Sequence, residues 1–169
     1  MPLKIRQATP TDQRAVKRII DSSFPKFFRF FALRSVNSEE GKVLVVQDQT
    51  AVAGFAKLIC LQVASRKCGC VLWLAVHPNC RRKGVASSLV KAGVEDLQRN
   101  GAILVFASVT RRNNASLGTF GKEGFRRIGF GGLWQLFGWR IFRFYSGIWY
   151  APSEIVLMYS AAETENAPI

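Results

Sequence analysis

The sequence predicts one α/β (α+β) domain, in which strands and amphipathic helices alternate along 169 residues. Two observations carry this prediction. Short apolar runs of strand length alternate with segments whose apolar residues recur at helical spacing. Hydrophobic residues make up 49% of the chain, which suits a single core at this length. We therefore expect one domain over residues 1–162 and a disordered polar tail over 163–169.

The N-terminal part of the chain reads as a strand, a helix and a hairpin. Residues 3–7 form a short predicted strand. A helix then begins at Thr9, an N-cap residue that is followed by proline, and its apolar residues recur at helical spacing. The next apolar stretch, 42–63, is typical of a hairpin that turns near Asp48 and Gln49.

The rest of the chain continues the alternation. Residues 69–76 are an uninterrupted apolar run, as in a buried central strand. Residues 85–99 place their apolar side chains on one helix face, and 102–109 is a second buried strand. A short helix over 114–123 ends before a glycine, and 153–160 is the final predicted strand.

The charge and the cysteines limit the partners. A net charge of +13 attracts phosphates and repels polycations. Basic residues interleaved with phenylalanines could stack bases, but no nucleic-acid-binding signature accompanies them, so we do not expect nucleic acid as a partner. The chain has one histidine, and the cysteines lack the spacing of zinc ligands, so we expect reduced thiols, no metal and a cytoplasmic location. The cysteines are Cys60, Cys68, Cys70 and Cys80.

One basic loop separates the strand at 69–76 from the helix at 85–99. Its segment "HPNCRRKG" brings Arg81, Arg82 and Lys83 directly before Gly84. Free backbone N–H groups and the positive end of the helix dipole meet there, which favours phosphate binding. The alternative interpretation is a solvated basic turn.

The six residues from Arg81 to Ala86, "RRKGVA", match the [Q/R]xxGx[G/A] acetyl-CoA loop of the GNAT (general N-acetyltransferase) superfamily. The flanking segments "LAVHP", "NNASLGTFGKEGF" and "IRQATPTD" also resemble that family, over roughly residues 3–129 and again at 153–161. The resemblance is closest to N-terminal acetyltransferases of the ribosomal-protein type. It implies the GNAT fold, a central mixed twisted sheet of six to seven strands flanked by helices, here with an aromatic insertion before the last strand.

The resemblance also implies acetyl-CoA as co-substrate. Backbone amides from Arg82 to Ser87 would hold the pyrophosphate, the strand near Leu74 and Val76 would pair with the pantetheine, and Asn113 would contact it. The cofactor-binding residues implied in this way are Leu74, Val76, Arg81, Arg82, Lys83, Gly84, Val85, Ala86, Ser87, Asn113 and Phe120.

Two positions depart from the family pattern. Many members have a tyrosine acid where this chain has Phe120, and the similar ribosomal-protein enzymes have a glutamate base where it has Ser108. His77 lies in the phosphate turn, where a cation or a structural hydrogen bond is expected instead of a base. The catalytic residues stay unassigned, with Glu154, Tyr145, Tyr150 and Tyr159 as candidates.

The expected activity is acetyl-CoA-dependent N-acetyltransfer to an amine, preferably a protein or peptide α-amine. An α-amine with a pKa of about 8 is partly neutral at pH 7, whereas a lysine near ~10.4 is almost wholly protonated, so a site without an evident base favours the α-amine. The alternative is a catalytically silent acyl-CoA-binding protein that binds a membrane or a partner through its aromatic insertion.

Two aromatic segments are expected to flank the acceptor, 24–33 and 130–150. The second carries Arg140 and Arg143 near its middle, which argues against a transmembrane helix. It could cover the core, form a wall of the acceptor pocket or lie on a membrane surface, so peripheral membrane contact stays open. The residues expected to bind the acceptor are Phe24, Phe27, Phe28, Tyr145 and Tyr150.

Overall fold

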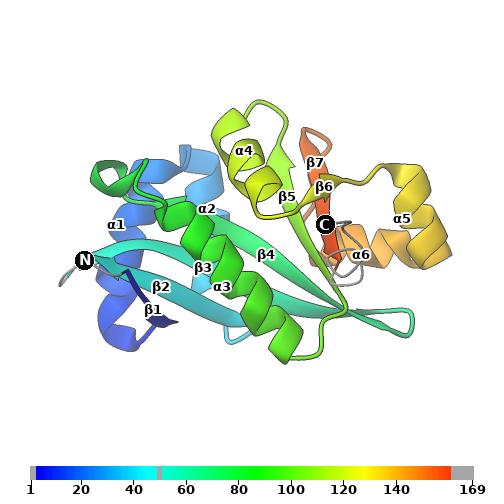
Figure 1. The fold of residues 1–169 in the computed structure, drawn as a ribbon, viewed down its shortest axis with the longest axis horizontal. Coiled ribbons are helices and arrows are strands. Elements are labelled where there is room, and N and C mark those ends of the chain that lie inside the picture. Colours follow the sequence, from blue (N-terminus) through cyan, green and yellow to red (C-terminus); the bar gives the residue numbers. More distant parts are fainter. Residues whose placement is uncertain (1–2, 49–50, 161–169) are drawn as a thin grey trace, which may run out of the picture. The chain divides into compact units, whose positions relative to one another are not determined.

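The computed structural model describes residues 3–48 and 51–160 (Figure 1). Within these residues seven strands form one mixed sheet in the order β1-β2-β3-β4-β5-β7-β6, with β4 and β5 parallel. This confirms the predicted α/β fold and its sheet of six to seven strands. The strands are β1 (Lys4–Gln7), β2 (Lys42–Asp48), β3 (Ala51–Val63), β4 (Arg66–Val76), β5 (Leu104–Thr110), β6 (Arg126–Arg127) and β7 (Glu154–Ser160).

The helices match the predicted positions in part. The segment 24–33 falls mostly within a helix, the insertion forms two short helices, and the helix expected from Thr9 begins as a 3-10 turn. The predicted turn at Gln49 and the predicted tail lie outside the described residues. The helices are α1 (Gln13–Ser23), α2 (Lys26–Val36), α3 (Val85–Arg99), α4 (Asn114–Lys122), α5 (Phe130–Phe137) and α6 (Ile141–Gly147), with 3-10 turns η1 (Pro10–Asp12), η2 (Pro78–Cys80) and η3 (Gly138–Arg140).

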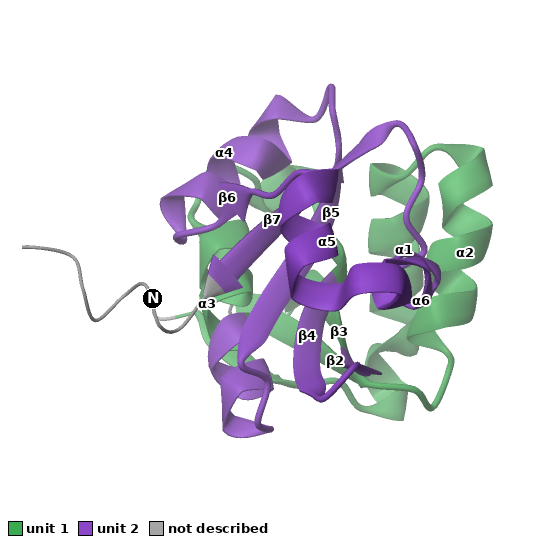
Figure 2. Ribbon diagram, turned by 90° about the vertical axis from the view of Figure 1, so that its right-hand side faces the viewer, with its two compact units in different colours: residues 1–59, 72–93 green, residues 60–71, 94–169 purple. Residues whose placement is uncertain are grey.

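The chain divides into two compact units, which Figure 2 colours separately. Unit 1 comprises residues 1–59 and 72–93, and unit 2 comprises 60–71 and 94–169. The strands β3 and β4 and the helix α3 each contribute one part to each unit.

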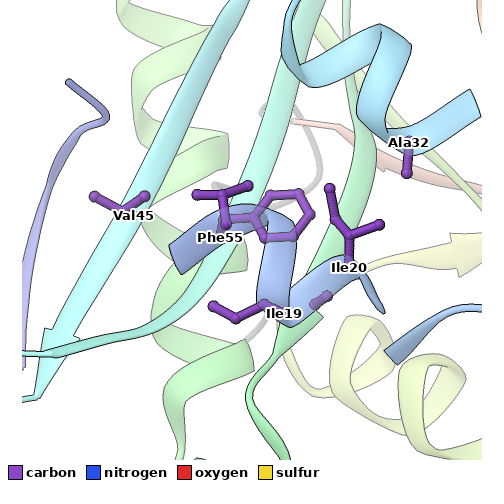
Figure 3. Close-up of a cluster of buried hydrophobic side chains, with 7 residues drawn as sticks. Ile19, Ile20, Ala32, Val45 and Phe55 are labelled. Carbon is purple, nitrogen blue, oxygen red and sulfur yellow. The ribbon is translucent and has the colours of Figure 1, made fainter. Parts of the chain in front are cut away.

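The core of unit 1 lies between its strands and the helices α1 and α2. Phe55 on β3 is fully buried and packs in one cluster with Ile19 and Ile20 of α1 and Ala32 of α2 (Figure 3). The opposite face of β3 carries Gly54, because side chains alternate along a strand. A Cβ at Gly54 would lie 2.8 Å from the carbonyl oxygen of Ala75 and 3.2 Å from Leu89 of α3, so only glycine permits this close packing.

An ion pair ties β1 to the start of α1 in unit 1. Arg6 donates to both carboxylate oxygens of Asp12, at 2.6 and 2.9 Å, and the N–H and hydroxyl of Thr9 donate to the same side chain. These hydrogen bonds, led by those from Arg6, hold the pKa of Asp12 well below its ordinary value, although burial opposes them. Asp12 is therefore a buried carboxylate that keeps its charge.

Unit 2 packs helices on both faces of β5 and β7. On one face Phe106 of β5 contacts Phe137 of α5 and Phe144 of α6, with ring centroids 6.0 and 4.7 Å apart. On the other face Phe125 lies between Phe120 of α4 and Tyr159 of β7. The insertion that contains α5 and α6 thus completes the core of this unit.

Candidate functional site

The loop between β4 and α3 lies in unit 1 and is held at its start by main-chain hydrogen bonds. The N–H of His77 donates to the carbonyl oxygen of Ala53 at 2.8 Å, and that of Cys80 donates to the carbonyl oxygen of His77 at 2.8 Å. Leu74 and Val76, at the end of β4, are half-buried. The end of this strand therefore fixes where the basic loop begins.

Gly84 gives this loop the geometry of an anion-binding turn. Its φ is +76°, which glycine adopts readily, and a Cβ built there would meet nothing within 4 Å. The first hydrogen bond of α3 runs from the N–H of Ser88 to the carbonyl oxygen of Gly84. The N–H groups of Val85, Ala86 and Ser87 consequently have no acceptor within the described residues, and they lie at the positive end of α3.

The three cations of the loop differ in their partners. The Arg81 guanidinium donates to the carbonyl oxygen of Val76 at 3.3 Å and to Ser23 Oγ at 3.4 Å. Arg82 and Lys83 are exposed and have no hydrogen-bond or ion-pair partner among the residues described, and Arg82 itself has a φ of +63°. Arg81 thus braces the loop, while Arg82 and Lys83 offer free positive charge to an anion.

His77 takes part in the local structure of the same turn. Its Nδ1 accepts a hydrogen bond from the N–H of Asn79 at 3.3 Å, so the side chain caps the 3-10 turn η2. The imidazole is thereby fixed within the loop.

Two of the expected cofactor-binding residues, Asn113 and Phe120, lie in unit 2. Asn113 is exposed at the N-terminus of α4, where its Oδ1 accepts from the N–H of Ser116 at 3.1 Å. Phe120 is only 3% exposed, and its ring packs on Phe125 with centroids 5.0 Å apart. Position 120 therefore belongs to the core of unit 2 and brings no hydroxyl group.

Ser108 on β5 contacts a carboxylate on the neighbouring strand β7. Ser108 pairs with Val156 in the antiparallel β5–β7 ladder, so Glu154, two residues earlier, lies on the same face. Ser108 Oγ donates to Glu154 Oε2 at 2.7 Å, and the N–H of Ala151 donates to the same oxygen at 3.0 Å. The second oxygen, Oε1, has no hydrogen-bond partner within the described chain and can accept a proton.

Two tyrosines stack on each other, and one of them contacts the main chain of Glu154. The rings of Tyr145 and Tyr150 stack with centroids 4.5 Å apart, and the hydroxyl of Tyr150 lies 3.5 Å from the main-chain oxygen of Glu154. Burial, and secondarily Tyr150, raises the pKa of Tyr145, so its hydroxyl stays protonated at neutral pH. Tyr159 lies on the opposite face, because it pairs with Val105.

The acceptor residues expected in unit 1 gather around a tryptophan that the sequence analysis did not single out. Trp73 on β4 contacts Phe24 edge-on at 5.4 Å and Phe28 at 6.5 Å between centroids. Phe27 packs on Phe28 and is 70% exposed. The indole Nε1 of Trp73 is buried and has no hydrogen-bond partner in the described structure.

The two buried cysteines, Cys68 and Cys70, offer no activated nucleophile. All four are free thiols. Burial raises the pKa of Cys68 to about 11 and that of Cys70 further still, so both stay protonated. Cys70 also lies near the charge of Glu154, which opposes its ionisation.

Sequence reasoning named Glu154 among several candidates but did not foresee its contact with Ser108. The register of the β5–β7 pairing would have shown it, since that register sets which residues share a face. Trp73 gave no separate signal, because it lies within an apolar run that is typical of any buried strand.

The chain belongs to the acetyltransferase (GNAT) family, because the sequence profile of that family matches residues 9–125, more than half of its length. This confirms the resemblance inferred from the loop and its flanking segments, and with it the assignment as an N-acetyltransferase. Acetyl-CoA-dependent acetyl transfer is the activity that this fold implies.

Solved structures agree on the fold. A GNAT-family protein from Desulfovibrio desulfuricans aligns with a TM-score of 0.72 at 17% identity, covering 94% of this chain and 99% of that one. The ribosomal-protein-S18-alanine N-acetyltransferase of Escherichia coli aligns at 0.65 and 18%, covering 94% of each chain. The PaiA N-acetyltransferase of Thermoplasma acidophilum, solved with coenzyme A, aligns at 0.64 and 13%, covering 95% and 99%. No curated protein sequence shows significant similarity to the chain.

Proposed function

We propose that this protein transfers the acetyl group of acetyl-CoA to the α-amine of a protein or peptide. The observation that carries the proposal is the loop before α3, where Gly84 leaves open space beside N–H groups that have no acceptor among the described residues. Similarity in fold to an enzyme named for acetylating an alanine of a ribosomal protein supports the choice of acceptor.

The loop residues fit the pyrophosphate of coenzyme A. In this proposal the N–H groups of Val85, Ala86 and Ser87 bind phosphate oxygens, and Arg82 and Lys83 neutralise their charge. Arg81 holds the loop through Val76 and Ser23. Leu74 and Val76 on β4 are proposed contacts of the pantetheine, as is Asn113, the N-cap residue of α4. Phe120 is buried in the core of unit 2 and brings no hydroxyl group.

Glu154 is the proposed general base. An acceptor α-ammonium gives one proton to Oε1, and the neutral nitrogen then attacks the thioester carbonyl carbon. The C–S bond breaks, the thiolate takes the second proton of the nitrogen, and Glu154 returns its own proton to water. Ser108 and the N–H of Ala151 keep the carboxylate in place through Oε2.

The leaving group needs less help than the amine does. A thiol with a pKa near ~8.5 is a tolerable anionic leaving group, so Phe120 in place of a tyrosine acid costs little. A lysine with a pKa near ~10.4 would have to lose its proton against a far larger free-energy cost than an α-amine with a pKa of about 8. This difference, together with the net charge of +13, favours an α-amine over polyamines and lysine side chains.

Aromatic side chains are the proposed contacts of the acceptor. In unit 1 these are Phe24, Phe27 and Phe28 near Trp73, whose indole N–H has no partner in the described structure and would donate to an acceptor carbonyl. In unit 2 they are Tyr145 and Tyr150 beside Glu154.

We place this activity in the cytoplasm, in a single folded domain over residues 1–162. The strands β3 and β4 and the helix α3 continue from one compact unit into the other, so both units are expected to unfold together. A single transition in urea by fluorescence and by circular dichroism would support one domain, and two separated transitions would contradict it.

The test is an acetylation assay with the whole chain and acetyl-CoA. Three acceptors are compared: a peptide with a free N-terminus and no lysine, the same peptide blocked at its N-terminus but containing lysine, and spermidine. The proposal predicts an acetylated product from the first alone. Preferred acetylation of lysine or spermidine would overturn it, and acetyl-CoA binding without turnover on any amine would favour the silent acyl-CoA-binding alternative.

A further inference from the structure

The insertion presents a set of exposed aromatic rings, which we call the aromatic surface. Trp139 is 78% exposed, Phe142 is 59% exposed and Phe130 is 55% exposed. Trp134 links two of them, because its ring lies 5.8 Å from that of Phe130 and 5.0 Å from that of Trp139 between centroids. Monomeric proteins rarely leave so many large rings in water without a use for them.

The core of unit 2 does not need these rings. Leu133, Phe137, Ile141 and Phe144 of the same insertion are all buried, and Phe137 and Phe144 already contact Phe106 on β5. The insertion is therefore anchored by one side while the other side carries the aromatic surface. An element that only completed a core would expose polar residues there.

Two arginines lie next to the exposed rings in sequence and line a hollow. Arg140 follows Trp139, and Arg143 follows Phe142. Both arginines border an open hollow of about 470 Å³, whose other lining residues are Gln62, Ala64 and Ser65 at the β3–β4 turn. Within the described residues neither guanidinium has a hydrogen-bond or ion-pair partner, and both are exposed.

We propose that the insertion docks this protein on an anionic membrane surface. The rings of Trp139, Phe142 and Phe130 enter the headgroup layer, and Arg140 and Arg143 bind the phosphate of an anionic lipid in the hollow. Aromatic rings beside arginines on short helices are the combination that lies at a membrane interface. Among the described residues, no helix has the length and apolar character that a membrane span requires.

The chemistry of the hollow excludes one competing use. Two guanidinium groups without carboxylates repel an ammonium group, so the hollow does not receive the amine acceptor. Single-stranded nucleic acid would also pair arginines with aromatic rings, so retention on RNA is one outcome of the test.

The inference does not rest on the acetyl-transfer proposal, and its test can fail independently. The whole chain is sedimented with vesicles of phosphatidylcholine mixed with phosphatidylserine, and with vesicles of phosphatidylcholine alone. We expect binding to the first and little to the second. Emission of Trp139 is expected to shift to shorter wavelength with the anionic vesicles, and that part of the shift to disappear in Trp139→Phe.

Variants distinguish the contributions of the arginines and of the aromatic rings to vesicle binding from the effect of the net charge. Arg140→Gln/Arg143→Gln is expected to weaken vesicle binding about 25-fold, since each arginine near an anionic surface contributes about fivefold. Trp139→Ser/Phe142→Ser is expected to weaken it at least about tenfold. The control, Lys122→Gln/Arg127→Gln, removes the same charge from exposed residues of the same unit and is expected to lose far less.

Every variant is checked by thermal unfolding and by acetyl-CoA binding, so that misfolding or loss of the cofactor site is recognised. An equal loss of vesicle binding in the control variant would mean that the net charge alone drives the binding, and it would overturn the proposal. So would displacement from the vesicles by inorganic phosphate, tighter retention on single-stranded RNA than on vesicles, or burial of the aromatic surface in a dimer in solution.

Discussion

The loop before α3 and the carboxylate at Ser108 are built in different ways. The loop uses consecutive residues, and its essential groups are main-chain N–H groups of Val85, Ala86 and Ser87. The carboxylate site joins side chains that are 46 positions apart in the chain, Ser108 on β5 and Glu154 on β7. A site made from consecutive backbone tolerates changes in its side chains, whereas a site made from two strands depends on their register.

The two sites also differ in how they relate to the family pattern, which the loop keeps and position 108 does not. The family glutamate is replaced by Ser108, yet a carboxylate still reaches that position from the adjacent strand. Cofactor binding and chemistry should therefore be separable by mutation.

The largest expected effect belongs to the carboxylate. Glu154→Gln keeps the shape of the side chain but cannot accept a proton, so kcat for an α-amine acceptor should fall about 100-fold or more at pH 7. The affinity for acetyl-CoA should not change. The difference in kcat between Glu154→Gln and the wild type should become smaller as the pH rises past about 8, because solvent then deprotonates the acceptor amine.

Ser108→Ala is the matched control for that prediction. It removes one hydrogen bond to Glu154 Oε2 and leaves the one from Ala151, so its loss of kcat should be much smaller. Values of kcat measured over a pH series for both variants test whether Glu154 acts as a general base. Equal losses in the two variants, or a Glu154→Gln deficit that is constant with pH, would mean that the carboxylate has only a structural role.

The next effect concerns the stability of unit 1. Asp12→Asn should lower the free energy of unfolding by about 2 kcal/mol at pH 7, because it leaves the guanidinium of Arg6 without its carboxylate. The pKa of Asp12 is lowered in the folded protein, so its contribution is present above the ordinary carboxyl pKa and is lost as the pH falls through and below it.

Urea unfolding at pH 7 and in acid measures this contribution. The wild type should lose stability on acidification more steeply than Asp12→Asn. Lys17→Gln serves as the control, because it breaks the exposed Lys17–Asp21 pair and should cost little. Parallel pH curves for the wild type and Asp12→Asn would refute the assignment.

A smaller effect is expected at Trp73. Trp73→Phe removes an indole N–H that has no partner in the described structure, so stability should stay within about 1 kcal/mol of the wild type. If that N–H donates to the acceptor, KM for the peptide should rise about fivefold with kcat little changed. An unchanged KM for the peptide would mean that the indole N–H of Trp73 does not bind the acceptor.

The smallest effect compares two neighbouring arginines. Arg82→Gln removes a free cation and should weaken acetyl-CoA binding about threefold, with less dependence on salt. Arg81→Gln removes the contacts with Val76 and Ser23 instead, and should show itself mainly in thermal stability. The reverse assignment of the two effects would mean that Arg81 is the cation that binds phosphate.

Much of the fold was predictable, because it follows from local patterns. The apolar run over 69–76 and the helical spacing over 85–99 place β4 and α3, and the "RRKG" segment places the loop between them. The helix α2 was not predictable from the sequence, because aromatic residues at almost every position show no helical spacing. These are the phenylalanines at 27, 28, 30 and 31.

What could not be predicted depends on contacts between distant segments. The hydrogen bond from Ser108 to Glu154 requires the register of β5 on β7, which no local pattern contains. One partner of Arg81, Ser23, comes from the end of α1, 58 positions away in the chain. Aromatic residues occur throughout the insertion, so its sequence does not show which rings are buried. The contacts with Phe106 distinguish the buried rings from the exposed ones.

The most direct test of the account is calorimetric titration of acetyl-CoA into the wild type, Gly84→Glu and Glu154→Gln. Glutamate at position 84 places a negative charge in the open space of the loop and strains a backbone that has a φ of +76°. Gly131→Glu, another glycine with open space around it, controls for the added charge. We predict micromolar binding by the wild type, Gly131→Glu and Glu154→Gln, and at least about 100-fold weaker binding by a folded Gly84→Glu. Unchanged binding in Gly84→Glu would contradict the assignment of the loop as the coenzyme site.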